Sequence, residues 1–303
     1  ALKRRGVVLS RDVILVANAD EELGSSGSLW FTGQQADLLR NAEFLLNEGG
    51  ENLMGRDGKA ISYGLDATEK VPYWLRLTVR GEPGHGSRPT AGNAALRLSR
   101  VLGRIADWET PLVLTPPAAA YLQALATREA DPTYRAWLAD PAAALKDPAA
   151  VAWLTADRYQ NAILRNTVTI TVLRGSTNTN VIPSEALAEL DVRLLPGQVP
   201  EDFLAQLRAV IRDTTVEITP LSKLRAARSS PVQGPVLDAL TDAVAAMDSY
   251  DYRALGIDAY GIESWRTTDE VSATVHGNNE RVPVPEIRFG VEFYYRIVEQ
   301  LAR

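Results

Sequence analysis

The order of strand and helix patterns over residues 71–222 constrains the fold of this chain more than any other feature of its sequence. The patterns predict a strand, a helix, two strands, a helix and a strand, at 71–84, 93–109, 166–176, 185–197, 200–213 and 215–222. The predicted strands alternate apolar and polar residues, whereas the helices repeat apolar residues at helical spacing. This βαββαβ order is that of the split ferredoxin-like sandwich.

A different pattern flanks this region on both sides. Before it, we expect a strand at about 13–18, a helix in the thirties and a second apolar strand in "EFLLNEGG". After residue 223, we expect a helix in "PVLDALTDAVAAM", the segment "GIDAYGI" and a closing helix in "PEIRFGVEFYYRIVEQLAR". Strand, helix, strand is the order of an α/β layer with a parallel sheet, so the smaller domain is inserted into a larger α/β domain.

The stretch 111–163 is an Ala-rich insertion between the first helix and the second strand of the sandwich. Its prolines at 132, 141 and 148 each follow an Asp, as prolines at helix starts do. We therefore predict a series of short helices there.

Composition excludes several classes of function. The net charge of -6 and the pI near 5.2 argue against a nucleic-acid or anionic-membrane surface, because phosphates need clustered Lys and Arg. No apolar run approaches the roughly 20 residues that span a bilayer. The chain of 303 residues is therefore expected to be a soluble globular protein, with cytoplasmic, secreted and periplasmic locations all open.

The N-terminal residues "ALKRRG" resemble the last turn of a helix that stops at Gly6, so we expect the chain to begin inside a domain. Because it has no cysteine, its chemistry must come from oxygen and nitrogen groups.

Acidic residues follow both apolar strands of the larger domain. Glu21 and Glu22 come after the run Val13–Ala17, and Glu48 comes after the second strand. Ligands of open parallel sheets collect beyond the carboxyl ends of the strands, and His276 would add an imidazole. This donor set suits Zn²⁺ or a similar divalent ion, whereas the alternative is solvated loop acids or helix N-caps.

Five segments, in order and spacing, resemble the zinc-dependent family that contains aminoacylase, carboxypeptidase S, glutamate carboxypeptidase, acetylornithine deacetylase and succinyl-diaminopimelate desuccinylase. They are "ANADEELGSSGS", "LLNEGG", "GEPGHGSRP", "STNTNVIPSEALAELDVRLLPG" and "VHGNNERVP". The resemblance implies an α/β zinc-peptidase-like catalytic domain, residues 1–72 and 223–303, incomplete at its N-terminus. Residues 73–222 would be an inserted ferredoxin-like lid and dimerisation domain that carries the helical insertion.

The resemblance also implies roles at a two-metal site for zinc, with cobalt or manganese as alternatives. Glu21 matches the general base, Glu22 matches a ligand of one metal, and Glu48 and His276 match ligands of the other.

Three further residues match positions that contact the substrate. His85 matches a histidine that, in dimeric members, reaches the active site of the neighbouring subunit and stabilises the oxyanion. Asn180 and Arg193 match residues near the substrate carbonyl and carboxylate. Asn180 could instead cap a turn, and Arg193 could be an exposed strand residue.

One departure from the family pattern affects the activity expected of this chain. The upstream His-x-Asp ligand motif and the bridging Asp are not found, so we expect the chain alone to be inactive. The parent protein would hydrolyse an amide bond next to a free carboxylate, as a carboxypeptidase, dipeptidase or N-acyl-amino-acid amidohydrolase does, and would form a homodimer through the inserted domain. The alternative is a non-catalytic homodimerising fragment or degenerate homologue.

Overall fold

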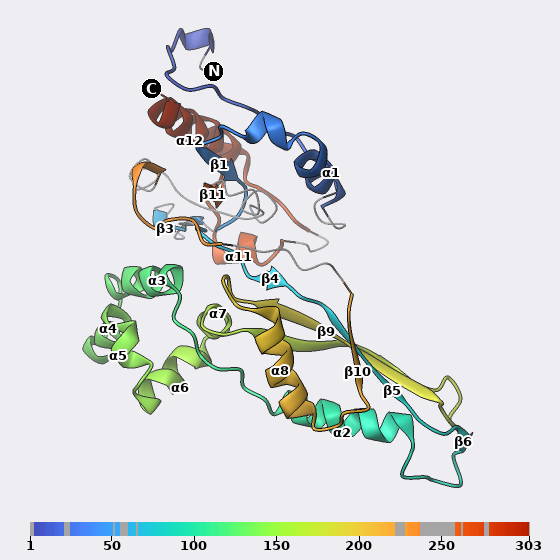
Figure 1. The fold of residues 1–303 in the computed structure, drawn as a ribbon. Helices are drawn as coiled ribbons and strands as arrows, with labels where there is room; N and C mark the ends of the chain where they lie inside the picture. The colour runs from blue at the N-terminus through green and yellow to red at the C-terminus, as the bar shows by residue number, and fades with distance from the viewer. Residues whose placement is uncertain are drawn as a thin grey trace. The chain divides into compact units, whose positions relative to one another are not determined.

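The computed structural model divides the chain into two compact units (Figure 1). The described residues are 3–20, 25–50, 52–54, 60–64, 66–221, 228–236, 258–261, 263–275 and 279–302. Unit 1 consists of Ala1–Glu69 and Ala227–Arg303, and unit 2 consists of Lys70–Ala226. Unit 2 therefore interrupts unit 1 in the sequence.

The antiparallel sheet of unit 2 has the strand order of a ferredoxin-like sandwich. Its main elements are β5 (Leu75–Arg80), α2 (Ala94–Ala106), β7 (Thr167–Arg174), β9 (Glu185–Leu194), α8 (Pro200–Ile211) and β10 (Glu217–Pro220). The strands lie in the order β10-β5-β9-β7, and each neighbouring pair is antiparallel. The predicted βαββαβ order is confirmed.

The first strand is divided, unlike the single strand predicted for 71–84. A short strand β4 (Val71–Pro72) pairs with β9 ahead of β5. Beyond β5, the two residues of β6 (Gly84–His85) leave the main sheet and pair with β8 (Val181–Ile182). Proline has no N–H to donate to a strand ladder, which limits pairing within β4.

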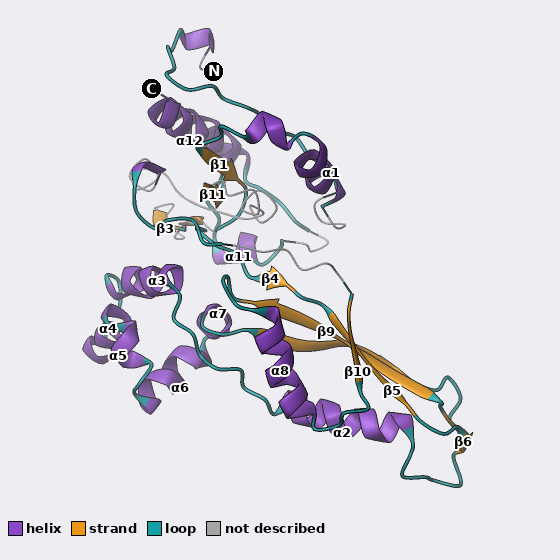
Figure 2. Ribbon diagram, in the orientation of Figure 1, coloured by secondary structure: helices purple, strands orange, loops and turns teal. Residues whose placement is uncertain are grey.

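One face of this sheet carries the core of the sandwich. Successive side chains of a strand point to opposite faces, and every second residue of β9 is buried. The buried side chains on β9, α2 and α8 are Ala186, Ala188, Leu190, Val192, Leu194, Ala94, Leu98, Val101, Ile105, Phe203, Leu207 and Ile211. Figure 2 shows α2 and α8 on the same face of the sheet. Because burial of one such side chain contributes about 1.5–3 kcal/mol, this layer supplies much of the stability of unit 2.

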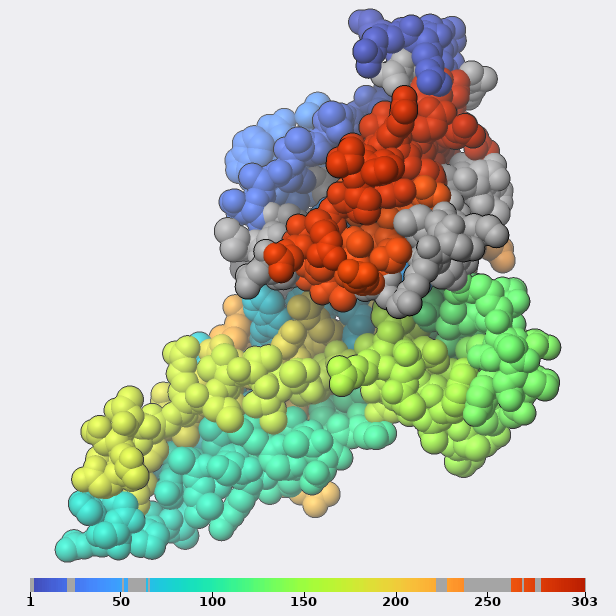
Figure 3. Space-filling view, turned by 180° about the vertical axis from the view of Figure 1, so that it is seen from behind, coloured from blue at the N-terminus to red at the C-terminus, as the bar shows by residue number. Residues whose placement is uncertain are grey.

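The helical insertion has a core of its own. It contains α3 (Pro116–Ala126), α4 (Pro132–Ala139), α5 (Pro141–Ala144), α6 (Pro148–Ala156) and α7 (Arg158–Ile163). Its buried side chains, Leu122, Leu138, Leu154 and Leu164 among them, form one apolar cluster. Figure 3 shows the insertion (green) as a lobe to one side of the strands of unit 2.

Three helices of the insertion, α4, α5 and α6, begin where the Asp-Pro pairs predict. The side chains of Asp131, Asp140 and Asp147 each accept a hydrogen bond from a backbone N–H of the following first turn. Proline occupies the first helical position, where its missing N–H is not needed. Each cap of this kind typically contributes about 1 kcal/mol.

The two ends of the insertion lie side by side. Leu112 forms an isolated antiparallel bridge with Arg165, and the backbone N–H of Val113 donates to the carbonyl of Leu164 at 2.7 Å. The chain therefore enters and leaves the insertion at neighbouring points.

Unit 1 contains a parallel strand pair, as an α/β layer requires. Strand β1 (Phe44–Asn47) pairs in parallel with β11 (Asp258–Gly261). The other elements that the structure describes in unit 1 are η1 (Lys3–Arg5), α1 (Ser26–Gln34), η2 (Ala36–Leu39), β2 (Asn52–Met54), β3 (Ala60–Tyr63), α11 (Asp269–Ser272) and α12 (Val284–Ala302). Phe293 and Ile297 of α12 pack with Ala67 and Val236 in its core, so the expectation of a closing helix is confirmed.

The strand expected at about 13–18 is not formed. These residues have no regular secondary structure, and Leu15 is 92% exposed. An apolar run forms a strand only where a neighbouring strand supplies backbone hydrogen bonds. The strand β1 pairs with β11 and not with residues 13–18. The helix expected from Pro235 onward lies almost entirely outside the described residues.

We predict that the carboxylate of Asp213 stabilises unit 2 above about pH 4. Arg97 of α2 donates to Asp213 at 2.9 Å, and the Thr215 hydroxyl donates at 2.6 Å. Hydrogen bonds from Thr215 and Arg97 lower the pKa of Asp213 to about 2. Because the folded pKa lies below the unfolded value, this contribution is lost as the pH falls through 2.

Urea unfolding at pH 7, 4, 3 and 2 checks this prediction. Asp213→Asn should reduce the free energy of unfolding by about 1 kcal/mol at pH 7 and flatten its decline between pH 4 and 2. Glu82→Gln is the matched control, because Glu82 is exposed and the described residues give it no hydrogen-bond or ion-pair partner. An equal effect of both substitutions would contradict the prediction.

We also predict that Glu286→Gln destabilises unit 1 by about 3 kcal/mol, because it removes the negative charge from a nearly buried carboxylate that forms two hydrogen bonds with the Arg266 guanidinium. Arg266 donates to both carboxylate oxygens of Glu286 at 2.8 Å and lies over the Phe289 ring at 4.3 Å. The Glu286 side chain is only 6% exposed. Chemical denaturation measures the loss.

The control for this substitution is Glu292→Gln on the same helix. Glu292 forms exposed ion pairs with Arg5 and Arg296, so its loss should cost less than about 1 kcal/mol. If Glu286→Gln and Glu292→Gln lower the free energy of unfolding by the same amount, the Arg266–Glu286 pair does not stabilise the first turn of α12 as predicted.

Candidate functional site

Glu48 lies at the carboxyl end of the parallel strand pair. It follows β1 directly, and its side chain is exposed. The next two residues, Gly49 and Gly50, have φ values of 131° and 63°, a backbone conformation that glycine adopts readily. The Gly50 N–H donates to the Asp66 carboxylate at 3.2 Å. This turn presents the Glu48 carboxylate beyond the sheet, where ligands of such sheets collect.

A second carboxylate lies near Glu48. Strand β11 ends at the same edge of the sheet as β1, with Asn47 opposite Gly261, and Glu263 follows shortly after. Burial, and then the charges of Glu263 and Glu48, raise the pKa of Tyr294 to about 12. The Tyr294 hydroxyl therefore stays neutral in the physiological range. Glu263 was missed by sequence reasoning, although it follows a strand end as Glu48 does.

The other predicted groups of the metal site lie outside the described residues. They are the general base Glu21 and the ligands Glu22 and His276. Among the described residues, no three His, Asp or Glu side chains come close enough together to hold a metal ion. The described member of the predicted set, Glu48, suits a divalent cation, because its carboxylate oxygens are hard ligands and its side chain is exposed.

His85 and Asn180 lie next to each other at one end of unit 2. His85 of β6 pairs with Val181 of β8, and the Gly86 N–H donates to the Asn180 carbonyl at 2.7 Å. A Cβ on Gly86 would lie 3.3 Å from backbone atoms of Asn180, so a glycine permits this close approach. Both candidate side chains are exposed.

An open polar hollow of about 440 Å³ adjoins this pair. It is lined by Gly86, Pro89, Asn93, Ala95, Ser176, Thr177, Asn178, Thr179, Val181, Ile182 and Pro183. Hydroxyl and amide groups dominate its polar surface, and none of the lining residues is charged. Such a hollow can form hydrogen bonds with a neutral amide.

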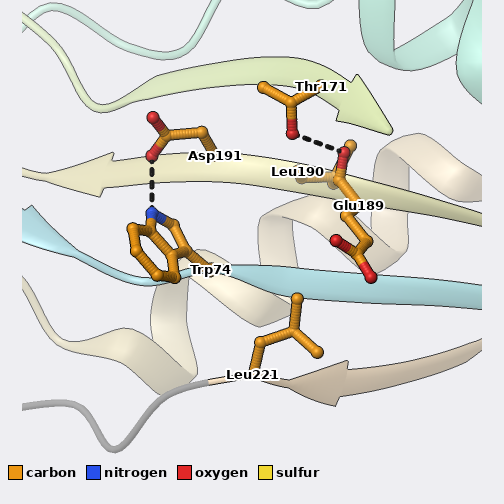
Figure 4. A pocket seen from close by; sticks show the side chains of 6 residues that line it. All are labelled: Trp74, Thr171, Glu189, Leu190, Asp191 and Leu221. Atoms are coloured by element: carbon orange, nitrogen blue, oxygen red, sulfur yellow. Dashed lines mark hydrogen bonds between the residues drawn. The ribbon is translucent and has the colours of Figure 1, made fainter. Parts of the chain in front are cut away.

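Arg193 lies on the opposite face of β9 from α2 and α8. Its Nε donates to Asp191 Oδ1 at 2.8 Å, and the Trp74 Nε1–H donates to the same oxygen at 3.0 Å. Figure 4 shows Trp74 and Asp191 in a shallow pocket with Thr171, Glu189, Leu190 and Leu221. The Arg193 side chain is 42% exposed, so its guanidinium is oriented by Asp191 and remains open to an anion.

Lys70 is a second cation close to Arg193. Its ammonium donates to the carbonyls of Ala162 and Arg165 and to the Thr167 hydroxyl, at 2.8–2.9 Å. Burial, and then repulsion by Arg193, lower the pKa of Lys70 to about 8. Because all three ammonium hydrogens are engaged, Lys70 fastens the end of the helical insertion to the sheet and is not a ligand group.

Arg193 is not brought together with His85 and Asn180. Glu185 and Arg193 are eight positions apart on β9, a span of roughly 26 Å at about 3.3 Å per residue. The last residue of β5, Arg80, pairs with Glu185. His85 pairs with Val181, so it lies beyond this end of β9, away from Arg193. One copy of unit 2 therefore holds two separate sets of candidate substrate-binding groups.

The segment 263–275 gives Arg266 a structural position. Its guanidinium is engaged by Glu286, as described above, and Trp265, the preceding residue, is half-buried.

None of the helices that the structure describes combines the length and the apolar character needed to cross a membrane.

Comparisons with known proteins agree with this architecture. Residues 69–219 match the peptidase dimerisation domain family. A probable carboxypeptidase S-like protein of Dictyostelium discoideum is 24% identical over 98% of this chain and 61% of its own length. Aminoacylase-1A of Rattus norvegicus is 27% identical over 99% of this chain and 67% of its own length. The chain thus spans about three fifths of the length of the carboxypeptidase S-like relative.

A solved structure extends the comparison to the fold. The M20 family metallo-carboxypeptidase Sso-CP2 of Sulfolobus solfataricus superposes with a TM-score of 0.61 at 16% identity, covering 93% of this chain and 68% of that protein. The match covers both units, and the resemblance seen in the sequence is confirmed. Residues 69–219 belong to the peptidase dimerisation domain family, and the chain as a whole shares the fold of the M20 family metallo-carboxypeptidase structure.

Proposed function

We propose that the protein is a metal-dependent hydrolase that cleaves an amide bond next to a free carboxylate, in an N-acyl amino acid, a dipeptide or the C-terminal residue of a peptide. The observation that carries this proposal is the alignment of nearly the whole chain with carboxypeptidase S-like and aminoacylase relatives. The position of Glu48 at the carboxyl end of a parallel strand pair supports it.

The proposed catalytic domain consists of residues 1–72 and 223–303, and the proposed lid and dimerisation domain of residues 73–222. Glu22, Glu48 and His276 are the proposed metal ligands, for zinc or else cobalt or manganese. A bound divalent ion supplies Lewis-acid chemistry. Of these ligands, the described residues include only Glu48.

The proposed roles of the protein side chains follow from their chemistry. The Glu21 carboxylate accepts a proton from the attacking water and passes it to the leaving amine nitrogen. The Arg193 guanidinium, oriented by Asp191, binds the substrate carboxylate. His85 and Asn180 bind the substrate near the scissile carbonyl, where His85 donates a hydrogen bond to the oxyanion.

The separation of these groups supports a site shared between two copies. The carboxylate and the scissile carbonyl of a dipeptide or N-acyl amino acid are only a few bonds apart, whereas His85 lies beyond the end of β9 that is roughly 26 Å from Arg193. If Arg193 and His85 act on one substrate, they come from different copies of the chain. A homodimer through the dimerisation domain provides that arrangement.

The first test is a hydrolysis assay on a panel of N-acyl amino acids and dipeptides with added Zn²⁺ or Co²⁺. It compares the 303-residue chain with a longer form that carries native residues before Ala1. We expect activity in the longer form, and a loss of at least about a hundredfold in Glu21→Gln. No hydrolysis by either form, with no stoichiometric metal, would favour the non-catalytic homodimerising alternative.

A second test addresses the shared site in whichever form is active. His85→Ala and Arg193→Ala should each be inactive alone. In an equal mixture, half of the dimers are mixed and each has one intact site, so activity should return to roughly a quarter of wild type. Absence of recovery, with subunit exchange verified by mass spectrometry, would place both residues in the same copy's site.

A further inference from the structure

The ring of His85 lies in a tight turn that brings two donor groups to one of its nitrogens. The Arg88 N–H donates to the His85 carbonyl at 2.9 Å and closes the turn. Within it, the Ser87 backbone N–H lies 3.2 Å from His85 Nδ1, and the Ser87 hydroxyl oxygen lies 2.8 Å from the same atom. Both groups of Ser87 therefore converge on Nδ1.

The backbone contact favours the tautomer in which Nδ1 carries no proton. A backbone N–H can only donate, so Nδ1 must accept with its lone pair and cannot itself carry a hydrogen. In a neutral imidazole the single proton then belongs to Nε2. The Ser87 hydroxyl, which can rotate, adds a second donor to the same lone pair.

We infer that Ser87 is a positioning residue that holds His85 as its Nε2–H tautomer. The Nε2–H group is then the one donor that the exposed ring offers to a ligand. Its use as an oxyanion donor rests on the proposed function, but the tautomer itself does not.

The base of the ring is fixed by the neighbouring strands. Gly84 pairs with Ile182 and His85 with Val181, while the Gly86 N–H is held by the Asn180 carbonyl. These contacts fix the backbone on both sides of the ring. The ring therefore keeps its relation to Ser87 while its other edge stays exposed.

The test uses the small number of histidines in the chain. With ¹⁵N-labelled histidine, the long-range ¹H–¹⁵N spectrum contains only the rings of His85 and His276, and His85→Gln assigns them. At about pH 8, where histidine is ordinarily neutral, we expect His85 to be mainly Nε2–H. A ring that is mainly Nδ1–H, or an equal mixture, would overturn the inference.

Substitutions of Ser87 test its role directly. Ser87→Ala should lower the ratio of the Nε2–H to the Nδ1–H form by about fivefold, since it removes one donor, and Ser87→Thr should restore the ratio. Ser184→Ala is the matched control, because among the described residues the Ser184 side chain forms no hydrogen bond. An unchanged ratio in Ser87→Ala would refute the positioning role.

Kinetics separate this inference from the proposed function. In an active form of the protein, Ser87→Ala should lower kcat about fivefold with little change in KM, because the oxyanion exists only in the transition state. A confirmed tautomer in a protein that hydrolyses no amide would leave the inference standing and remove the proposed function. Hydrolysis in which Ser87→Ala raises KM and leaves kcat unchanged would contradict the use of the ring as an oxyanion donor.

Discussion

The strand β9 is the element on which the rest of unit 2 depends. It pairs with β4, β5 and β7, and it is the only one of the four that contacts each of the others. Its buried residues lie on the face of the sheet that α2 and α8 cover, while Asp191 and Arg193 lie on the opposite face. A shift of one residue in its pairing would exchange these two faces, so a single register determines both the core and the place of Arg193.

Much of this fold is predictable from local patterns. The strand alternation, the helix spacing and the Asp-Pro pairs were sufficient for the sandwich and its insertion, because each pattern reflects contacts within or next to the element itself. The run at 13–18 was predicted wrongly for the opposite reason. Its apolar residues describe a strand only if another strand lies alongside, and local sequence does not contain that information.

The candidate site is less accessible to sequence reasoning because its parts come together through long-range pairing. The sequence motif around His85 marks this residue as a candidate substrate-binding group, but the hydrogen bonds of its ring depend on the geometry of the turn at Ser87. Likewise, Arg193 is recognisable as a candidate, whereas its orientation by Asp191 and the distance to His85 follow from the register of β9. Glu21, Glu22 and His276 remain predictions, since they lie outside the described residues.

The adjoining ends of the helical insertion have a consequence for how this unit can change. Because Val113 and Leu164 are hydrogen-bonded neighbours, a short turn in place of the segment between them would close the chain with little added strain. The insertion has its own apolar cluster and its own helix caps, so its sequence can vary without disturbing the sheet. The insertion can therefore be lengthened, shortened or replaced without a change in the strands and helices of the sandwich.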